Sequence, residues 1–376
     1  MRALSATLPE LAPAESEHDR CSADGCAQPV PRCTGACDDD PVNEAEIEDD
    51  RRQRVELLLS LASGDPSVDV DLTGVPGDPA AVARSVEVGR LMRHVRALAG
   101  GPRHPWSELE QARAAANYVE QELRASSLEP QSLGVTHRGV TLPVVWTSVP
   151  GSGAVAAGER APVRSAVVLV AHYDTVDQSP GADDNASGVA GLLEVARVLP
   201  RRTLPRDVVL AAVPFEEDPG GFAGSAAFAE HLTSVFGNGI VAAVSAEMLG
   251  CSAAPRVTGD TGKDLLLAGY PGTGPVIDLL LAAANAWSTG RVRGLAVPLH
   301  VPEIERSDHV SFHRQGIPAV MATDGAEFRN RHYHQPSDTP ETLDPQFLAG
   351  STQSLAVGLM ALASWGHPSQ ADRRGA

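Results

Sequence analysis

The chain has 376 residues, of which 43% are hydrophobic, so it is long enough for one large core or two modest domains. Its formal net charge is −18, and residues 1–80 contribute most of this charge because they hold 18 Asp and Glu but 6 Lys and Arg. An acidic chain does not suit the phosphate backbone of nucleic acid, which excludes that partner class. We find neither an apolar run of the ~20 residues that span a bilayer nor the apolar stretch of a signal peptide. We therefore expect a cytoplasmic protein, with a secreted form as the alternative.

Residues 1–80 are expected to form a disordered acidic segment and a linker, since residues 1–50 show no hydrophobic period. A short helix is possible at residues 44–63, where several apolar side chains cluster. Residues 65–79 are rich in Gly, Pro and Asp, which is typical of a linker.

Four of the five cysteines lie in this N-terminal segment, with the spacing C-x4-C-x6-C-x3-C from Cys21 to Cys37. Compact zinc modules pair their cysteines more closely, so a structural metal fits this spacing poorly. Free thiols are the favoured interpretation, and disulfides in an exported form are the alternative.

Residues 81–366 are expected to form the folded domain, followed by a disordered tail at 367–376. Helical spacing of apolar residues predicts a helix over 86–98 and a second over 107–127, with Ser107 as its N-cap. A hairpin is expected within 135–149. Further strands are predicted at 166–171, 207–215, 240–248 and 317–323, and further helices at 186–199, 224–235, 275–287 and 345–365. This alternation predicts a three-layer α/β/α sandwich around a mixed, mostly parallel sheet.

Histidine and acidic side chains follow three of the predicted strands directly. They are, in chain order, His172, Asp174, Glu216, Glu217 and Glu247. Each has an ordinary explanation when taken alone, because polar residues commonly end strands. The carboxyl ends of parallel strands, however, meet at one edge of the sheet, where ligands bind. We therefore expect these side chains to lie close together.

Carboxylates that are buried close together repel one another unless cations share the site, so this edge predicts a metal cluster. A polar loop at 329–339 adds the imidazoles of His332 and His334. Imidazole and carboxylate ligands together suit Zn²⁺, and tolerate Mn²⁺ or Co²⁺.

Six motifs, taken as a set, resemble the M28 family of metallopeptidases. In the order of that family they are AHYDT at 171–175, PGADDNASGVA at 180–190, FEE at 215–217, SAEMLG at 245–250, SDHVSFHRQGIPAVMATDG at 307–325 and RNRHYHQPSDTPETLD at 329–344. The similarity covers roughly residues 85–365. It implies the zinc-exopeptidase (phosphorylase/hydrolase-like) fold and a metallo-exopeptidase, most often an aminopeptidase, that acts on a peptide or small amide with two Zn²⁺ per chain.

The resemblance also implies a role for each metal ligand. His172 and Glu247 would bind the first metal, Glu217 and His334 the second, and Asp183 would bridge the two. Many relatives carry Asp where this chain has Glu247, which leaves the geometry at that ligand open.

Two further residues take catalytic roles by the same resemblance. Glu216 would be the general base, with a pKa well above that of a free Glu, and Asp174 would orient His172. A cis peptide is expected after the bridging residue, at Asp183–Asp184. Some relatives polarise the substrate carbonyl with a tyrosine, for which Tyr270 and Tyr333 are candidates.

Two rival functions stay open. Glutaminyl cyclases resemble the same fold and use a single zinc with acid–base carboxylates. A non-catalytic binding module on a peptidase fold is less favoured, because every motif position keeps a suitable side chain. The sequence does not reveal substrate specificity, the role of the acidic segment or the oligomeric state.

Overall fold

The computed structural model describes residues 44–153, 164–218, 221–253, 257–297 and 301–366. The chain divides into two units, 1–44 and 45–376, and it is the second that the description covers. The expected disordered tail at 367–376 and the four N-terminal cysteines lie outside the described residues.

Eight strands form one mixed sheet in the order β1-β2-β4-β3-β5-β8-β6-β7. The four central strands β4, β3, β5 and β8 run parallel to one another, whereas the hairpin β1–β2 and the pairs β2–β4 and β6–β8 are antiparallel. The strands are β1 (Gln131–His137), β2 (Val140–Val149), β3 (Ala166–His172), β4 (Asp207–Val213), β5 (Ile240–Glu247), β6 (Asp264–Gly269), β7 (Arg291–Ala296) and β8 (Ala319–Thr323).

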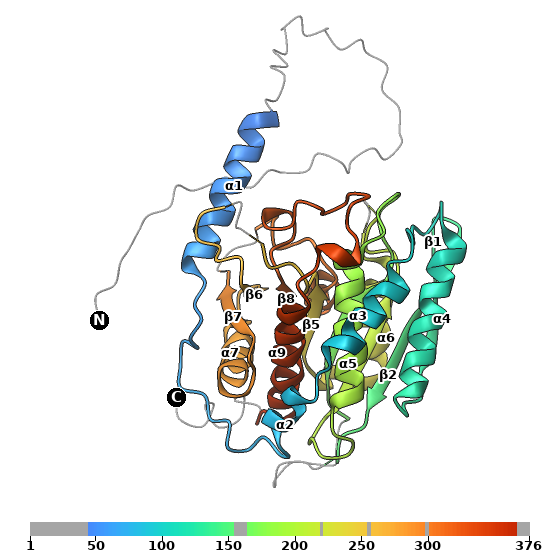
Figure 1. Cartoon of the computed structure of the whole chain (residues 1–376). Helices are drawn as coiled ribbons and strands as arrows, with labels where there is room; N and C mark the ends of the chain where they lie inside the picture. The colour runs from blue at the N-terminus through green and yellow to red at the C-terminus, as the bar shows by residue number, and fades with distance from the viewer. Residues whose placement is uncertain (1–43, 154–163, 219–220, 254–256, 298–300, 367–376) are drawn as a thin grey trace, which may run out of the picture. The chain divides into compact units, whose positions relative to one another are not determined.

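Helices cover both faces of this sheet, which confirms the predicted three-layer sandwich (Figure 1). One face carries α3 (Val88–Leu98), α4 (Leu109–Ala125), α5 (Gly188–Val198), α7 (Gly274–Trp287) and α9 (Pro345–Ser364). The other face carries α6 (Ala223–Phe236) and α8 (His309–Arg314). The central strands β3 and β5 are buried along their whole length, because helices pack on them from both sides.

Most predicted elements are confirmed to within a few residues, but three details differ. The second helix begins at Leu109 after Glu108, so Ser107 is not its N-cap. The strands β6 and β7 were not predicted, because each has six residues and β7 mixes Arg, Gly and apolar side chains. The short helices α2 (Pro79–Arg84) and α8 were also missed.

The N-terminal helix α1 (Glu44–Leu61) packs on the folded domain. Its buried Val55 and Leu59 contact a small apolar cluster that includes Leu266 of β6. Because side chains alternate along a strand, Leu266 faces α1 while its neighbours Leu265 and Leu267 belong to the core that includes α7.

Beyond α1, backbone hydrogen bonds join Ser63 and Gly294 in both directions, at 3.0 and 2.7 Å. Further on, the Asp278 carboxylate accepts hydrogen bonds from the backbone N–H and the hydroxyl of Ser67. Contacts with the folded domain therefore extend back into α1, to Arg51 and Val55, which lie before the expected domain start at residue 81.

The closing helix α9 is long and apolar enough to cross a membrane by length and composition alone. In the fold, 83% of its most apolar window is buried. It packs against α7, α5 and α2, which identifies it as a core helix.

A buried arginine fixes the loops beside the carboxyl edge of the sheet. Arg103 is 2% exposed, and its guanidinium donates hydrogen bonds to the backbone carbonyls of Tyr173, Leu98, Pro180 and Gly181. Burial lowers its pKa to about 10, so it remains charged at neutral pH. One side chain thus ties the end of α3 to the segment that follows β3.

Replacing this side chain should cost stability. In Arg103→Met the four carbonyls lose their donor while buried, so the free energy of unfolding should fall by about 2–5 kcal/mol in urea titrations. Arg113→Met is the control, because Arg113 is half exposed and its ion pair, among the residues described, is with Glu110 on its own helix. The control should change stability by no more than about 0.5 kcal/mol. Equal midpoints for the two variants would contradict the role of Arg103.

Candidate metal centre

The parallel register brings the predicted strand-end residues to one edge of the sheet. His172 is the last residue of β3 and pairs with Val213 at the end of the neighbouring β4, three residues before Glu216. Glu247 is the last residue of β5, on the other side of β3, and pairs with Thr323 of β8. The expectation that three strand ends share one site is confirmed.

Two sets of ligand-type side chains meet at Asp184. In the first set, His172 Nε2 lies 3.4 Å from a carboxylate oxygen of Glu247 and 3.4 Å from Asp184 Oδ1. In the second set, His334 Nε2 lies 3.0 Å from Glu217 Oε2 and 3.2 Å from Asp184 Oδ2. Each oxygen of the Asp184 carboxylate therefore faces a different imidazole, which is the arrangement of a bridging ligand.

The geometry corrects the expectation that Asp183 is the bridge. The Asp183 carboxylate points away from the histidines, where it accepts hydrogen bonds from the Gly250 backbone N–H at 2.9 Å and from Asn330 Nδ2 at 2.7 Å. The cis peptide likewise joins Asp184 to Asn185, one residue later than expected. The two aspartates are adjacent and chemically identical, so the sequence offers no signal that separates them.

Asn185 fixes the turn that carries Asp184 against the end of β5. Its Nδ2 donates to the carbonyl of Ala246, and its Oδ1 accepts from the backbone N–H groups of Gly188 and Met248. A Cβ atom on Gly188 would lie 2.2 Å from Asn185 Oδ1 and 2.4 Å from the Ala246 carbonyl oxygen. Only glycine permits this close approach, which places Asp184 beside Glu247.

Three non-glycine residues of the site adopt left-handed backbone conformations. They are Phe215 (φ 65°), Met248 (φ 53°) and His334 (φ 58°). Such residues are uncommon and cluster at functional sites. Phe215 immediately precedes Glu216, and Met248 immediately follows Glu247. The backbone therefore turns sharply at each of these two glutamates.

Asp174 supports the site differently from the expected role. Its carboxylate lies 3.8 Å from His172 Nδ1, beyond hydrogen-bonding distance. It instead accepts hydrogen bonds from the backbone N–H groups of Glu216 at 3.3 Å and Glu217 at 3.2 Å. The structure therefore supports Asp174 as a residue that positions the two glutamates.

The electrostatics of these groups fit a cation. Burial, together with the charge of Asp184, raises the pKa of Glu217 to about 8, and burial raises that of Glu216 well above its usual value. Although burial opposes protonation of His334, the carboxylates beside it raise its pKa to about 10. The raised pKa of His334 reflects the negative charge of the carboxylates beside it, whereas the raised pKa values of the glutamates reflect first their burial and then their acidic neighbours. Divalent cations at the two shared positions would balance this charge, and the imidazole and carboxylate donors suit zinc.

A second layer of buried acids lies behind the ligands and was missed from the sequence. Asp338 accepts hydrogen bonds from the backbone N–H groups of Asp183 at 3.0 Å and Asp184 at 3.1 Å. Burial and the neighbouring Asp183 raise the pKa of Asp324 well above its usual value, and oxygens of the two carboxyl groups lie within 4.8 Å of each other. These residues stand in quoted motifs, but nothing in their spacing distinguishes a ligand from its support.

The 329–339 loop supplies one imidazole to the site. His334 lies at the cluster, whereas His332 Nδ1 lies 2.9 Å from Ser337 Oγ, away from it. The ring of Tyr333 stacks on that of His334, with centroids 3.8 Å apart, and its hydroxyl accepts a hydrogen bond from Arg306 at 3.1 Å.

An open hollow of about 460 Å³ gives access to the second set of ligands. Glu216, Glu217 and His334 line it, together with Arg306 and Tyr333. Tyr270, the other candidate for carbonyl polarisation, does not line this hollow, and its ring stacks on His313.

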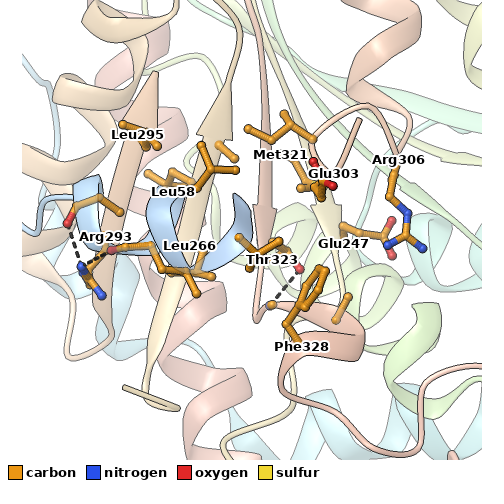
Figure 2. A pocket seen from close by; sticks show the side chains of 18 of the residues that line it. Leu58, Glu247, Leu266, Arg293, Leu295, Glu303, Arg306, Met321, Thr323 and Phe328 are labelled. Carbon is orange, nitrogen blue, oxygen red and sulfur yellow. Dashed lines mark hydrogen bonds between the residues drawn. The ribbon is translucent and has the colours of Figure 1, made fainter. Parts of the chain in front are cut away.

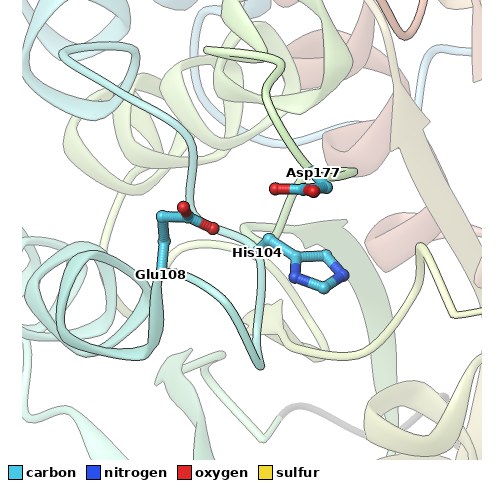
Figure 3. Close-up of side chains that lie close together, drawn as sticks. All are labelled: His104, Glu108 and Asp177. Atoms are coloured by element: carbon cyan, nitrogen blue, oxygen red, sulfur yellow. The ribbon is translucent and has the colours of Figure 1, made fainter.

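A separate group of ligand-type side chains, His104, Glu108 and Asp177, lies nearer the surface (Figure 3). The hydroxyl of Ser107 lies 2.8 Å from His104 Nδ1 and 3.1 Å from Asp177 Oδ1. The Ser107 hydroxyl also forms a hydrogen bond with the Glu108 carboxylate, so it links all three side chains.

Comparisons with known proteins agree with this geometry. The family model "Peptidase family M28" matches residues 154–357, which include every ligand candidate. The uncharacterized protein YfbL of Escherichia coli is 33% identical over 203 residues, which cover 49% of this chain and 62% of that protein. Aminopeptidase YwaD of Bacillus subtilis is 28% identical over 199 residues, covering 51% and 40%. The matches thus span about half of this chain and less than two thirds of these relatives.

Solved structures share the fold. The LapA aminopeptidase of Legionella pneumophila superposes with a TM-score of 0.61 at 18% identity, over 80% of this chain and 78% of that chain. A glutaminyl cyclase of Porphyromonas gingivalis gives a TM-score of 0.54 at 20% identity, over 73% of this chain and 98% of that chain.

The family match covers more than half of the chain, and its span contains His172, His334, Asp184 and the three glutamates at the carboxyl edge of the sheet. The chain belongs to peptidase family M28.

Proposed function

We propose that the protein is a zinc-dependent aminopeptidase that removes N-terminal residues with a water molecule activated by two metal ions. The observation that carries this proposal is the position of Asp184 between two histidines, each with its own glutamate. Membership of the family and the aminopeptidase YwaD among the relatives support the same activity.

The residues of the site divide into two ligand sets under this proposal. His172 and Glu247 would hold one zinc ion, His334 and Glu217 the other, and Asp184 would bind both. Bound zinc supplies Lewis acidity, which lowers the pKa of a shared water and stabilises negative charge on the scissile carbonyl.

Glu216 is the best-placed proton carrier in the site. Its Oε2 lies 4.0 Å from His172 Nε2, and it lines the open hollow without belonging to either ligand set. Burial raises its pKa well above the usual value of a glutamate, which brings it towards the range that a general base needs at neutral pH. Glu216 would accept a proton from the attacking water and return one to the leaving amine.

Positioning residues keep this carboxylate in place. The Asp174 carboxylate holds the backbone at Glu216 and Glu217, and Arg306 and Tyr333 border the same hollow. Arg306 and Tyr333 are donors within reach of a substrate carbonyl in that hollow, which makes Tyr333 the stronger of the two tyrosine candidates.

Removing the proton carrier should abolish turnover without loss of metal. Glu216→Gln should lower kcat/KM for aminoacyl-p-nitroanilides by about 10²–10⁴-fold while elemental analysis finds the wild-type zinc content. Glu110→Gln is the matched control, because Glu110 is 82% exposed on α4, and it should leave kcat/KM unchanged. Unchanged hydrolysis by Glu216→Gln would refute the assignment of the base.

Substitution of the two adjacent aspartates should have different effects on the zinc content of the protein. Wild-type protein should hold about two zinc ions per chain, and Asp184→Asn should lose most of this zinc because both ions share that carboxylate. Asp183→Asn should retain zinc but unfold at a lower temperature, because its amide would face the Gly250 and Asn330 donors. The reverse pattern in elemental analysis and thermal melts would return the bridge to Asp183.

The shared fold of glutaminyl cyclases keeps a second candidate function in view. A cyclase of the single-zinc type would bind one zinc ion per chain and convert N-terminal glutamine into pyroglutamate without releasing an amino acid. The complete second ligand set favours the peptidase. One zinc ion per chain together with pyroglutamate formation would overturn the aminopeptidase proposal.

A further inference from the structure

An apolar pocket of about 120 Å³ lies beside the candidate metal centre. Figure 2 shows Leu266 and Met321 from the sheet and Leu58 from α1 around it, with Glu247 and Arg306 towards one end. Its lining is therefore aliphatic over most of its surface, and one end reaches a ligand of the first metal set.

The pocket and the open hollow of the site are neighbours that share lining residues. Arg306 and Tyr333 line both spaces, and Glu247 lines the pocket. A substrate whose carbonyl lies at the ligands would therefore have the side chain of an adjoining residue within reach of the pocket.

Ion pairs anchor α1 over this pocket. Arg54 Nε and Nη2 donate to Glu303 Oε1 at 3.0 and 2.7 Å, and the Glu303 side chain is 5% exposed. Arg51 pairs with Glu327, which also pairs with Arg306. The charged groups around the pocket are thus largely matched with one another, and the space left between them is apolar.

The helix that closes the pocket does not come from the family region. The match begins at residue 154, whereas α1 ends at Leu61. Family membership therefore does not determine this wall, and its dimensions are a property of this chain.

We propose that the pocket receives the side chain of the substrate's N-terminal residue, and that Leu58 of α1 limits it to aliphatic side chains of about the size of leucine. This proposal rests on the proposed aminopeptidase function. An apolar cavity of about 150 Å³ is large enough for benzene, so a pocket slightly smaller accepts a branched aliphatic chain but not a larger aromatic one. One methylene group more or less on a substrate in an apolar pocket changes selectivity by about 10–200-fold.

Selectivity in turnover tests the proposal with two opposite changes at Leu58. Wild-type protein should prefer leucine-p-nitroanilide over the alanine and phenylalanine analogues. Leu58→Ala enlarges the pocket and should raise the ratio of kcat/KM for phenylalanine over leucine at least about 10-fold. Leu58→Trp should fill the pocket and lower kcat/KM for leucine by about the same factor while it spares alanine.

The same helix offers a matched control. Leu57 is 55% exposed and does not line the pocket, so Leu57→Ala should leave every ratio unchanged. Thermal melts of all three variants establish that the fold is intact before the ratios are compared.

A binding measurement separates this inference from the proposed function. In calorimetry with the zinc-loaded Glu216→Gln variant, which should not hydrolyse the amide, L-leucinamide should bind at least about 10-fold more tightly than glycinamide, and adding Leu58→Ala should reduce that preference. Absence of hydrolysis of any aminoacyl substrate would refute the aminopeptidase proposal, while the calorimetric ratio still decides the pocket. Equal ratios in Leu58→Ala and Leu57→Ala, or a preference for lysine or arginine that Glu303→Gln abolishes, would overturn the assignment of the pocket.

Discussion

The concentration of buried carboxylates at one edge of the sheet is the constraint on which the site depends. Glu216 and Glu217 follow one strand end, Glu247 ends a second strand and Asp184 lies in a turn, and burial denies these carboxylates the water that would screen their repulsion. Burial and the charge of Asp184 raise the pKa of Glu217, and the carboxylates beside His334 raise its pKa, so positive charge is favoured at this edge. Under the proposed function, a pair of divalent cations would satisfy that requirement and supply the Lewis acidity of a hydrolase.

The surrounding structure resists this repulsion through backbone hydrogen bonds rather than through side-chain pairs alone. Asp174 and Asp338 each accept two neighbouring backbone N–H groups, and Asn185 joins the Asp184 turn to the end of β5. Arg103 also holds the backbone in place, but as a donor, because it donates hydrogen bonds to four backbone carbonyls of the adjoining segments. The candidate ligands are therefore positioned through backbone N–H and C=O groups. Every residue type carries these groups, which explains why so few of the positioning contacts can be recognised in the sequence.

The N-terminal helix α1 lies outside the span of the family match, but its side chains contact residues within that span. Its ion pairs reach Glu303 and, through Glu327, Arg306, which lies at the border of the candidate active site. Under the two proposals, catalysis and substrate selection would depend on different parts of the chain: the strand ends carry the candidate ligands, and α1 lines the apolar pocket.

The sequence by itself determined the three-layer sandwich, the strand ends that carry polar side chains and the approximate positions of the five candidate metal ligands. It could do so because hydrophobic periodicity is a local property, and because the carboxyl ends of parallel strands meet at one edge of a sheet. Tertiary structure decided the rest. Asp183 and Asp184 differ only in the direction that a turn gives each carboxylate, and that direction depends on Asn185, Asn330 and Gly250, which are remote from one another in the chain. Likewise, α1 could be predicted as a helix from its leucines, but its place over the pocket depends on contacts with residues more than two hundred positions away, such as Glu303. Local patterns cannot encode such contacts, because only folding brings those partners together.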